Sequence, residues 1–118
     1  MELIKQAKYD GYEVYLETCP HYLLLTEEKI RELGPYAKCN PPLRKKEVVD
    51  KLWDYVLDGT VDFIGSDHGP FLPQEKDIGH EDIFKAPAGM IGVDLRLPLL
   101  LNEVLLISGK YLAQTLNC

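Results

Sequence analysis

The sequence predicts an α/β fold in which helices flank a parallel sheet. Helical and strand-like patterns alternate along the 118 residues in the order helix, strand, helix, helix, strand, helix. The length is that of a single domain, and a composition of 46% hydrophobic and 27% charged residues is ordinarily globular. In segment 61–70 an apolar run stops abruptly at Ser-Asp-His-Gly-Pro. A carboxylate at the carboxyl end of a buried strand is where α/β enzymes keep their chemistry.

The N-terminal part of the sequence carries a helix and the first strand. Residues 2–9 place apolar side chains on one helical face, and Gly11 supplies a left-handed end to that helix. The helix starts without a capping residue, and we expect a preceding part of the protein to be missing. Residues 13–18 alternate with the period of a strand, which Pro20 closes because it cannot donate a backbone hydrogen bond.

Two helices are predicted between the strands. Thr26 is placed to cap a short helix over residues 27–33, whose acidic first turn opposes the positive helix end. After the extended pair Pro41-Pro42, residues 45–57 carry apolar side chains at helical spacing. This helix feeds the second strand, which makes half of a βαβ unit.

A long loop and further helical sequence complete the chain. Residues 66–89 are rich in Gly, Pro and charge, and loops of that length are usually functional or disordered. Residues 95–104 are predicted to form a buried helix with Pro98 in its first turn. Residues 108–116 are predicted to add another helix.

Charge and composition exclude several classes of partner. The net charge of −6 gives no basic surface for nucleic acid and argues against anionic membranes. No segment reaches the roughly 18 apolar residues needed to cross a bilayer, and the N-terminus lacks the layout of a signal peptide. Three cysteines without a Cys-x-x-Cys pair indicate reduced thiols in a cytoplasmic protein.

Asp67 is the first candidate for chemistry because it directly follows the second strand. A buried carboxylate needs a partner, and a cation is the strongest available, although a strand-end acid can also cap a loop. The adjacent His68 could divide metal ligation and hydrogen bonding with it. His21 follows the other strand, and parallel strands would bring His21 and His68 to the same edge, with structural and functional roles of His21 equally open.

Other residues give weaker signals. Cys19 is expected to be a small buried hydrophobic residue. Asn40 precedes two prolines and can present a donor and an acceptor to a planar amide, or it is a turn residue. The small residues of the stretch 86–89, including Ala88 and Gly89, could bring their backbone close to a ligand.

These motifs, taken in order, resemble those of the cyclic amidohydrolases, the family of allantoinases, dihydroorotases, hydantoinases and dihydropyrimidinases. The matching motifs are Glu-Thr-Cys-Pro-His-Tyr (17–22), Lys-Cys-Asn-Pro-Pro-Leu-Arg (38–44), Gly-Ser-Asp-His-Gly-Pro (65–70) and Lys-Ala-Pro-Ala-Gly (85–89). The resemblance implies that residues 1–104 belong to a metal-dependent (β/α)8 TIM barrel and form its C-terminal part, about the last third. This part would contain two parallel strands with flanking helices. Residues 105–118 are an atypical or truncated tail that lacks the family's pattern.

The resemblance also implies a site for a small cyclic amide. Asp67 would bind the metal and handle the proton of the attacking water, while Asn40 helps to hold the substrate and Ala88 with Gly89 offers backbone contacts. The cofactor would be a divalent ion, expected to be Zn²⁺ and binuclear in the complete enzyme. The complete protein is expected to be a homo-oligomer.

The family's other metal ligands, a His-x-His pair, a modified lysine and two further histidines, are absent from this sequence. We therefore expect this chain alone to be inactive. His21 and His68 are expected beside the metal ligands rather than among them, and both favour the allantoinase and dihydroorotase side of the family. Because Phe71 stands where dihydroorotases commonly carry another histidine, an allantoinase-like enzyme is favoured.

Two other functions stay open. A non-catalytic dihydropyrimidinase-like scaffold protein would keep the barrel and lose its metal ligands, which the retained Asp67 argues against. A small independent metal-binding module would use Cys19, His21, Asp67 and His68, although this spacing matches no structural zinc pattern.

Overall fold

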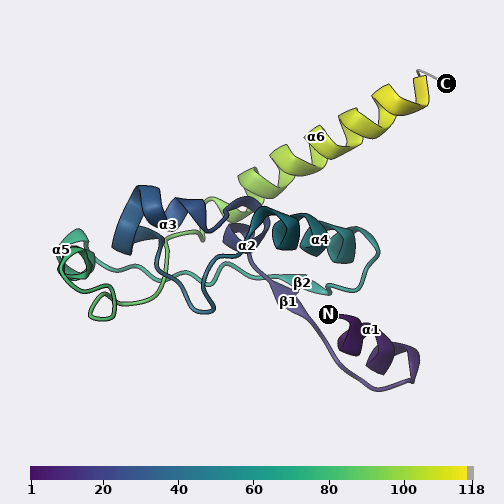
Figure 1. Cartoon of the computed structure of the whole chain (residues 1–118). Coiled ribbons are helices and arrows are strands. Elements are labelled where there is room, and N and C mark those ends of the chain that lie inside the picture. The colour runs from purple at the N-terminus through teal and green to yellow at the C-terminus, as the bar shows by residue number, and fades with distance from the viewer. Residues whose placement is uncertain (117–118) are drawn as a thin grey trace.

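The computed structural model describes the backbone of residues 1–116 and the side chains of residues 1–106. Two short parallel strands, β1 (Glu17–Thr18) and β2 (Phe63–Ile64), lie at the centre with helices around them (Figure 1). The helices are α1 (Glu2–Tyr9), α2 (Pro20–Leu24), α3 (Glu28–Leu33), α4 (Lys46–Leu57), α5 (Pro73–Asp77) and α6 (Arg96–Leu116), with the 3₁₀ helices η1 (Gly34–Ala37) and η2 (Ile78–His80). The prediction of two parallel strands with flanking helices is confirmed.

The first strand is shorter than its sequence pattern predicts. Only two residues pair, Glu17 with Phe63 and Thr18 with Ile64. Just before them the carbonyl of Leu16 still accepts hydrogen bonds from two amides of the segment that leads into β2. Residues 13–15 have no strand partner in the described chain, because β2 begins too late to reach them.

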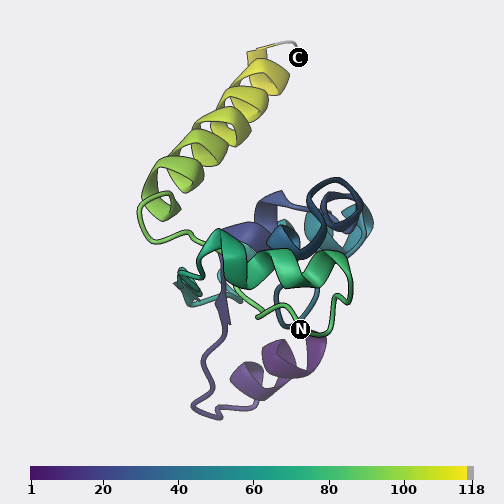
Figure 2. The same cartoon turned by 90° about the vertical axis from the view of Figure 1, so that its left-hand side faces the viewer.

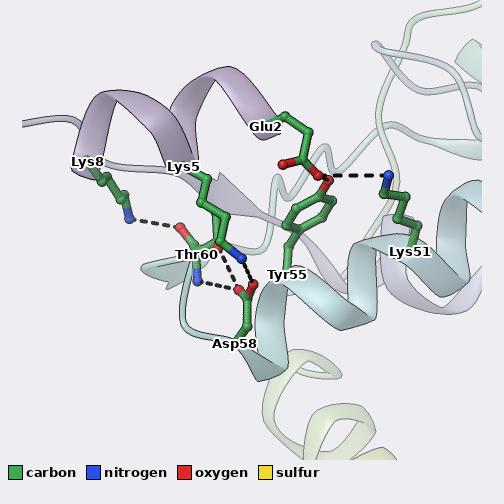
Figure 3. Close-up of polar contacts among 7 residues, drawn as sticks. All are labelled: Glu2, Lys5, Lys8, Lys51, Tyr55, Asp58 and Thr60. Atoms are coloured by element: carbon green, nitrogen blue, oxygen red, sulfur yellow. Dashed lines mark hydrogen bonds and ion pairs between the residues drawn. The ribbon is translucent and has the colours of Figure 1, made fainter. Parts of the chain in front are cut away.

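Helix α1 spans the predicted residues, but polar contacts rather than burial hold it to the body of the chain (Figure 3). None of its residues is buried, and Leu3 on the predicted apolar face is 85% exposed. The Lys5 ammonium lies 2.5 Å from the Asp58 carboxylate, and the Lys8 ammonium donates to the Thr60 carbonyl at 2.8 Å. Helix α4 supplies Tyr55, whose hydroxyl donates to the first acidic side chain of α1.

The second helix, α2, is absent from the sequence-based prediction. The sequence predicts that Pro20 closes a strand, but proline is also favoured at the first position of a helix, and it begins α2. Leu23 on this helix is fully buried. The predicted cap of α3 is wrong, because the Thr26 hydroxyl donates to the Glu28 side chain and caps no backbone amide.

The core lies between α2, η1 and the segment that leads to α4. Ala37, Cys39 and Leu43 form its buried centre, and Tyr22 and Met90 pack against them. Helix α4 lies against α2 and is fastened there by its tryptophan, whose ring N–H donates to the carbonyl of Leu23 at 2.8 Å. The predicted helix 45–57 is therefore confirmed to within one residue.

The long loop and the C-terminal region both differ from the prediction. Residues 66–89 contain α5 and η2, so this segment is not without structure. The two helices predicted over residues 95–104 and 108–116 are one continuous helix, α6, with Pro98 in its first turn as predicted. Residues 117 and 118 of the predicted tail lie outside the described residues.

Helix α6 projects away from the rest of the molecule and is not buried (Figures 1 and 2). Its apolar side chains Leu97 and Leu101 are 64% and 53% exposed. The prediction of a buried helix is wrong because its apolar residues find few neighbours in this chain beyond α2. Among the described residues, no helix combines the length and the apolar character that crossing a bilayer requires.

Candidate active site at the strand ends

Asp67 lies three residues beyond β2 in an unusual backbone conformation. Its φ of +45° is in the left-handed region, which only a few per cent of non-glycine residues adopt. The side chain is 53% exposed, so the prediction of a buried carboxylate is wrong. Its Oδ2 atom lies 3.8 Å from Nε2 of His21, which follows β1. The ends of the two parallel strands thus bring these two side chains together, whereas the sequence predicts that His21 shares this edge with His68.

His21 is the buried member of this pair. Its side chain is 9% exposed, and its Nε2 atom has no hydrogen-bond partner in the described chain. Burial lowers the pKa of His21, and the nearby Asp67 carboxylate only partly opposes that effect. The imidazole is therefore neutral near pH 7, which is the form that binds metals. A buried polar atom without a partner is costly, so Nε2 is available to a ligand.

His68 is engaged with the backbone of a third segment. Its Nδ1 atom accepts hydrogen bonds from the backbone amides of Gly92, at 3.1 Å, and Val93, at 3.4 Å. The backbone of His68 also forms a parallel bridge with Met90. His68 therefore fastens the chain after Asp67 to the segment before α6.

The Asn40 and Gly89 segments meet beside the Asp67 loop. Asn40 is exposed, and its side-chain amide forms no hydrogen bond within the described part of the chain. The Gly89 amide donates to the Lys38 carbonyl at 2.9 Å, and the Gly69 amide donates to the Met90 carbonyl at 2.8 Å. A methyl group on Gly69 would lie 2.9 Å from Cα of Gly89, so the two backbones touch. All four sequence motifs meet here, because His21 of the first motif lies 3.8 Å from Asp67 and the Tyr22 hydroxyl donates to the Pro41 carbonyl at 2.9 Å.

The structure gives little support to an independent metal-binding module. Within the described residues, no three His, Cys, Asp or Glu side chains come together. Cys19 is buried, and burial raises the pKa of its thiol to about 11, which fits the predicted structural role. The Nδ1 atom of His68 is already engaged with the backbone amides of Gly92 and Val93.

Sequence reasoning missed two lysines that lie behind the Gly89 segment. Lys76 is 4% exposed, although it stands in the charged string Gln-Glu-Lys-Asp, which is typical of a solvated helix start. Lys38 binds three backbone carbonyls of the loop that precedes Gly89. No local pattern marks either residue, because their partners are main-chain atoms far along the sequence.

Comparison with known proteins identifies relatives of this chain. No family model matches the chain. The allantoinase of Rubrobacter xylanophilus is 48% identical over 101 residues, which cover 86% of this chain and 22% of the relative. The L-hydantoinase of Paenarthrobacter aurescens is 39% identical over 103 residues (87% and 22%), and the dihydroorotase of Endomicrobium trichonymphae is 42% identical over 104 residues (88% and 24%).

Solved structures agree with these relatives. An L-hydantoinase (dihydropyrimidinase) from Arthrobacter aurescens superposes with a TM-score of 0.80 at 39% identity, over 85% of this chain and 22% of that one. A D-hydantoinase superposes with a TM-score of 0.81 at 34% identity, over 87% and 23%. In this chain an acid and an imidazole lie together at the ends of the two parallel strands, which is where α/β proteins commonly carry their functional residues. The chain is homologous over most of its length to cyclic amidohydrolases, and it spans 22% of the length of the first relatives it matches.

Proposed function

We propose that this chain supplies one edge of the active site of a metal-dependent hydrolase that opens the C–N amide bond of a cyclic amide. It would form the C-terminal part of a (β/α)8 barrel, whose strands point their carboxyl ends at the substrate. The observation that carries the proposal is the pair of Asp67 and His21 at the ends of β2 and β1. The names of the relatives, allantoinase, L-hydantoinase and dihydroorotase, indicate the substrate class.

The residues present fit a divalent cation in part. Asp67 offers a carboxylate, and 3.8 Å away His21 offers a neutral nitrogen that has no partner in the described chain. Oxygen and nitrogen ligands of this kind suit Zn²⁺, but a catalytic site needs about three protein ligands. Asp67 would hold the ion together with residues outside this sequence, so the 118-residue chain alone should be inactive. When bound, such an ion lowers the pKa of a water molecule and polarises a carbonyl group.

Groups of this chain would transfer the proton of the attacking water and bind the substrate ring. The exposed Asp67 carboxylate would take the proton of the attacking water and return it to the leaving ring nitrogen. The Asn40 amide can donate to and accept from the planar ring amide. The Gly89 amide is already bound to Lys38, which leaves the Ala88 N–H and the Gly89 carbonyl for the substrate.

A hybrid enzyme tests the proposal. Residues 1–104 replace the matching segment of the Rubrobacter xylanophilus allantoinase, and hydrolysis of allantoin, dihydroorotate and hydantoin is measured. The hybrid should open at least one of these rings, with allantoin favoured, and Asp67→Asn should abolish that activity. Asp54→Asn is the matched control, because Asp54 is an exposed acid on α4. A folded, zinc-loaded hybrid that hydrolyses none of the three would refute the proposal, as would ring opening by the isolated chain.

A further inference from the structure

Lys76 is a buried lysine whose ammonium group binds only main-chain carbonyls. Its Nζ atom donates to Pro87 at 2.8 Å and to Pro35 and Lys38, both at 3.3 Å. A protonated lysine has three N–H donors and no acceptor, so these three bonds satisfy it completely. A neutral amine would have only two donors. The geometry therefore requires the charged form.

Lys38 makes the same kind of bonds. Its Nζ atom donates to the carbonyls of Ile83 at 2.7 Å, Phe84 at 3.2 Å and Ala86 at 2.5 Å. Its own carbonyl accepts the hydrogen bonds of both Lys76 and the Gly89 amide. The two lysines therefore connect residues 35–38 with residues 83–89 through six charge-assisted bonds and one amide bond.

This arrangement is costly. Lysine is almost never fully buried unless it is paired with an acid, and neither Lys76 nor Lys38 forms an ion pair within the described residues. Burial lowers the pKa of Lys76, and the charge of Lys38 adds to that effect. An apolar side chain would fill the same space at lower cost if packing were the only requirement.

Both lysines act on the segment that carries Ala88 and Gly89. The Lys76 ammonium lies 5.6 Å from the centre of the Phe71 ring, and that ring touches the positions of both Gly69 and Gly89. Among the described residues, the hydrogen bonds of the two ammonium groups go to main-chain carbonyls and not to Asp67 or Asn40. Their bonds determine which backbone groups of this segment remain free.

We propose that Lys76 and Lys38 are positioning residues that hold the Ala88–Gly89 backbone in place for binding a cyclic amide. This inference rests on the proposed function for its substrate class. The carbonyl of Ala86 accepts a hydrogen bond from the Lys38 ammonium, and that of Pro87 accepts one from the Lys76 ammonium. The Gly89 amide donates to the Lys38 carbonyl. The Ala88 amide and the Gly89 carbonyl form no hydrogen bond among the described residues, so they are the groups of this segment that remain for a ligand.

The first test needs no activity. Amide hydrogen exchange is measured on the full 118-residue chain and on Lys76→Met, Lys76→Arg, Lys38→Met and Lys85→Met variants. Lys85 lies on the same loop with an exposed side chain and is the matched control. Lys76→Met and Lys38→Met should each speed exchange at the Gly89 amide by about tenfold to 100-fold, which corresponds to the loss of charge-assisted bonds. Amides of α4 should be unaffected, and Lys76→Arg should retain part of the protection.

The second test measures kinetics in the hybrid allantoinase. Lys76→Met should raise KM for the ring about tenfold with a smaller change in kcat, because it disturbs the binding of ground state and transition state alike. Unchanged exchange at Gly89, equal loss of protection in α4, or the same effect from Lys85→Met would overturn the proposal. An active hybrid whose KM is unchanged by Lys76→Met would also overturn the proposal. An inactive hybrid with the expected exchange pattern would contradict the proposed function and leave the positioning of this backbone supported.

Discussion

Replacing Gly69 by alanine should push the Asp67 loop away from the Ala88–Gly89 backbone. The added methyl group would lie 2.9 Å from Cα of Gly89 and 3.2 Å from a ring carbon of Phe71. The obstacle is main chain, and the 2.8 Å hydrogen bond from the Gly69 amide to Met90 holds the two segments together. Such overpacking costs about 1–3 kcal/mol, which corresponds to a roughly 5- to 150-fold loss in an equilibrium or rate constant.

The assay is the kcat/KM of the hybrid allantoinase for its best ring substrate. Gly69→Ala should lower it within that range, and the thermal midpoint shows whether the variant is folded. Gly92→Ala is the control on the same surface, because its methyl group would meet only the Ser66 carbonyl, at an ordinary 3.4 Å. A folded Gly69→Ala hybrid with unchanged kinetics would show that contact between these backbones is irrelevant to the site.

Three further predictions concern the scaffold. The hydrogen bond from Lys5 lowers the pKa of Asp58 from its usual 3.8 to about 2. The loss of unfolding free energy caused by Asp58→Asn should therefore be constant above pH 3.8 and disappear as the pH falls toward 2. A loss that does not change with pH would contradict this. Leu23→Ala should cost about 2–5 kcal/mol in urea unfolding followed by Trp53 fluorescence, and a loss under about 1 kcal/mol would place Leu23 outside the core. Cys19, with its pKa raised to about 11 by burial, should resist alkylation at pH 8 until urea unfolds the chain, as peptide mass spectrometry would show.

Elements with strong local signals could be predicted from the sequence, and those that depend on a partner could not. Helices α1 and α4 match their predicted ranges within one residue, because periodicity and a terminal turn are properties of the segment itself. The extent of β1 depends on the length of β2, which the β1 sequence does not contain. Pro20 is compatible with both a strand end and a helix start, and only the tertiary structure decides between them.

The same distinction applies to the site. The meeting of His21 and Asp67 follows from parallel strands, whose carboxyl ends share an edge, and the structure agrees. The direction of His68 depends on the left-handed turn at Asp67, which the residue type alone does not reveal. The burial of Lys76 depends on three carbonyls contributed by residues up to 41 positions away.

The backbone conformation of Asp67 allows a substitution that should remove activity without lowering stability. A left-handed backbone costs an L-residue about 1–2 kcal/mol, and glycine avoids that strain but loses about 0.5–1 kcal/mol through chain entropy. At 3.8 Å from His21 the carboxylate is too far for a hydrogen bond, and it forms none within the described chain. Asp67→Gly should therefore leave the unfolding free energy of the chain unchanged or raise it by up to about 1 kcal/mol. The same change should abolish ring opening in the hybrid. Clear destabilisation in urea unfolding would instead mean that the carboxylate supports the fold, and the site would lose its main argument.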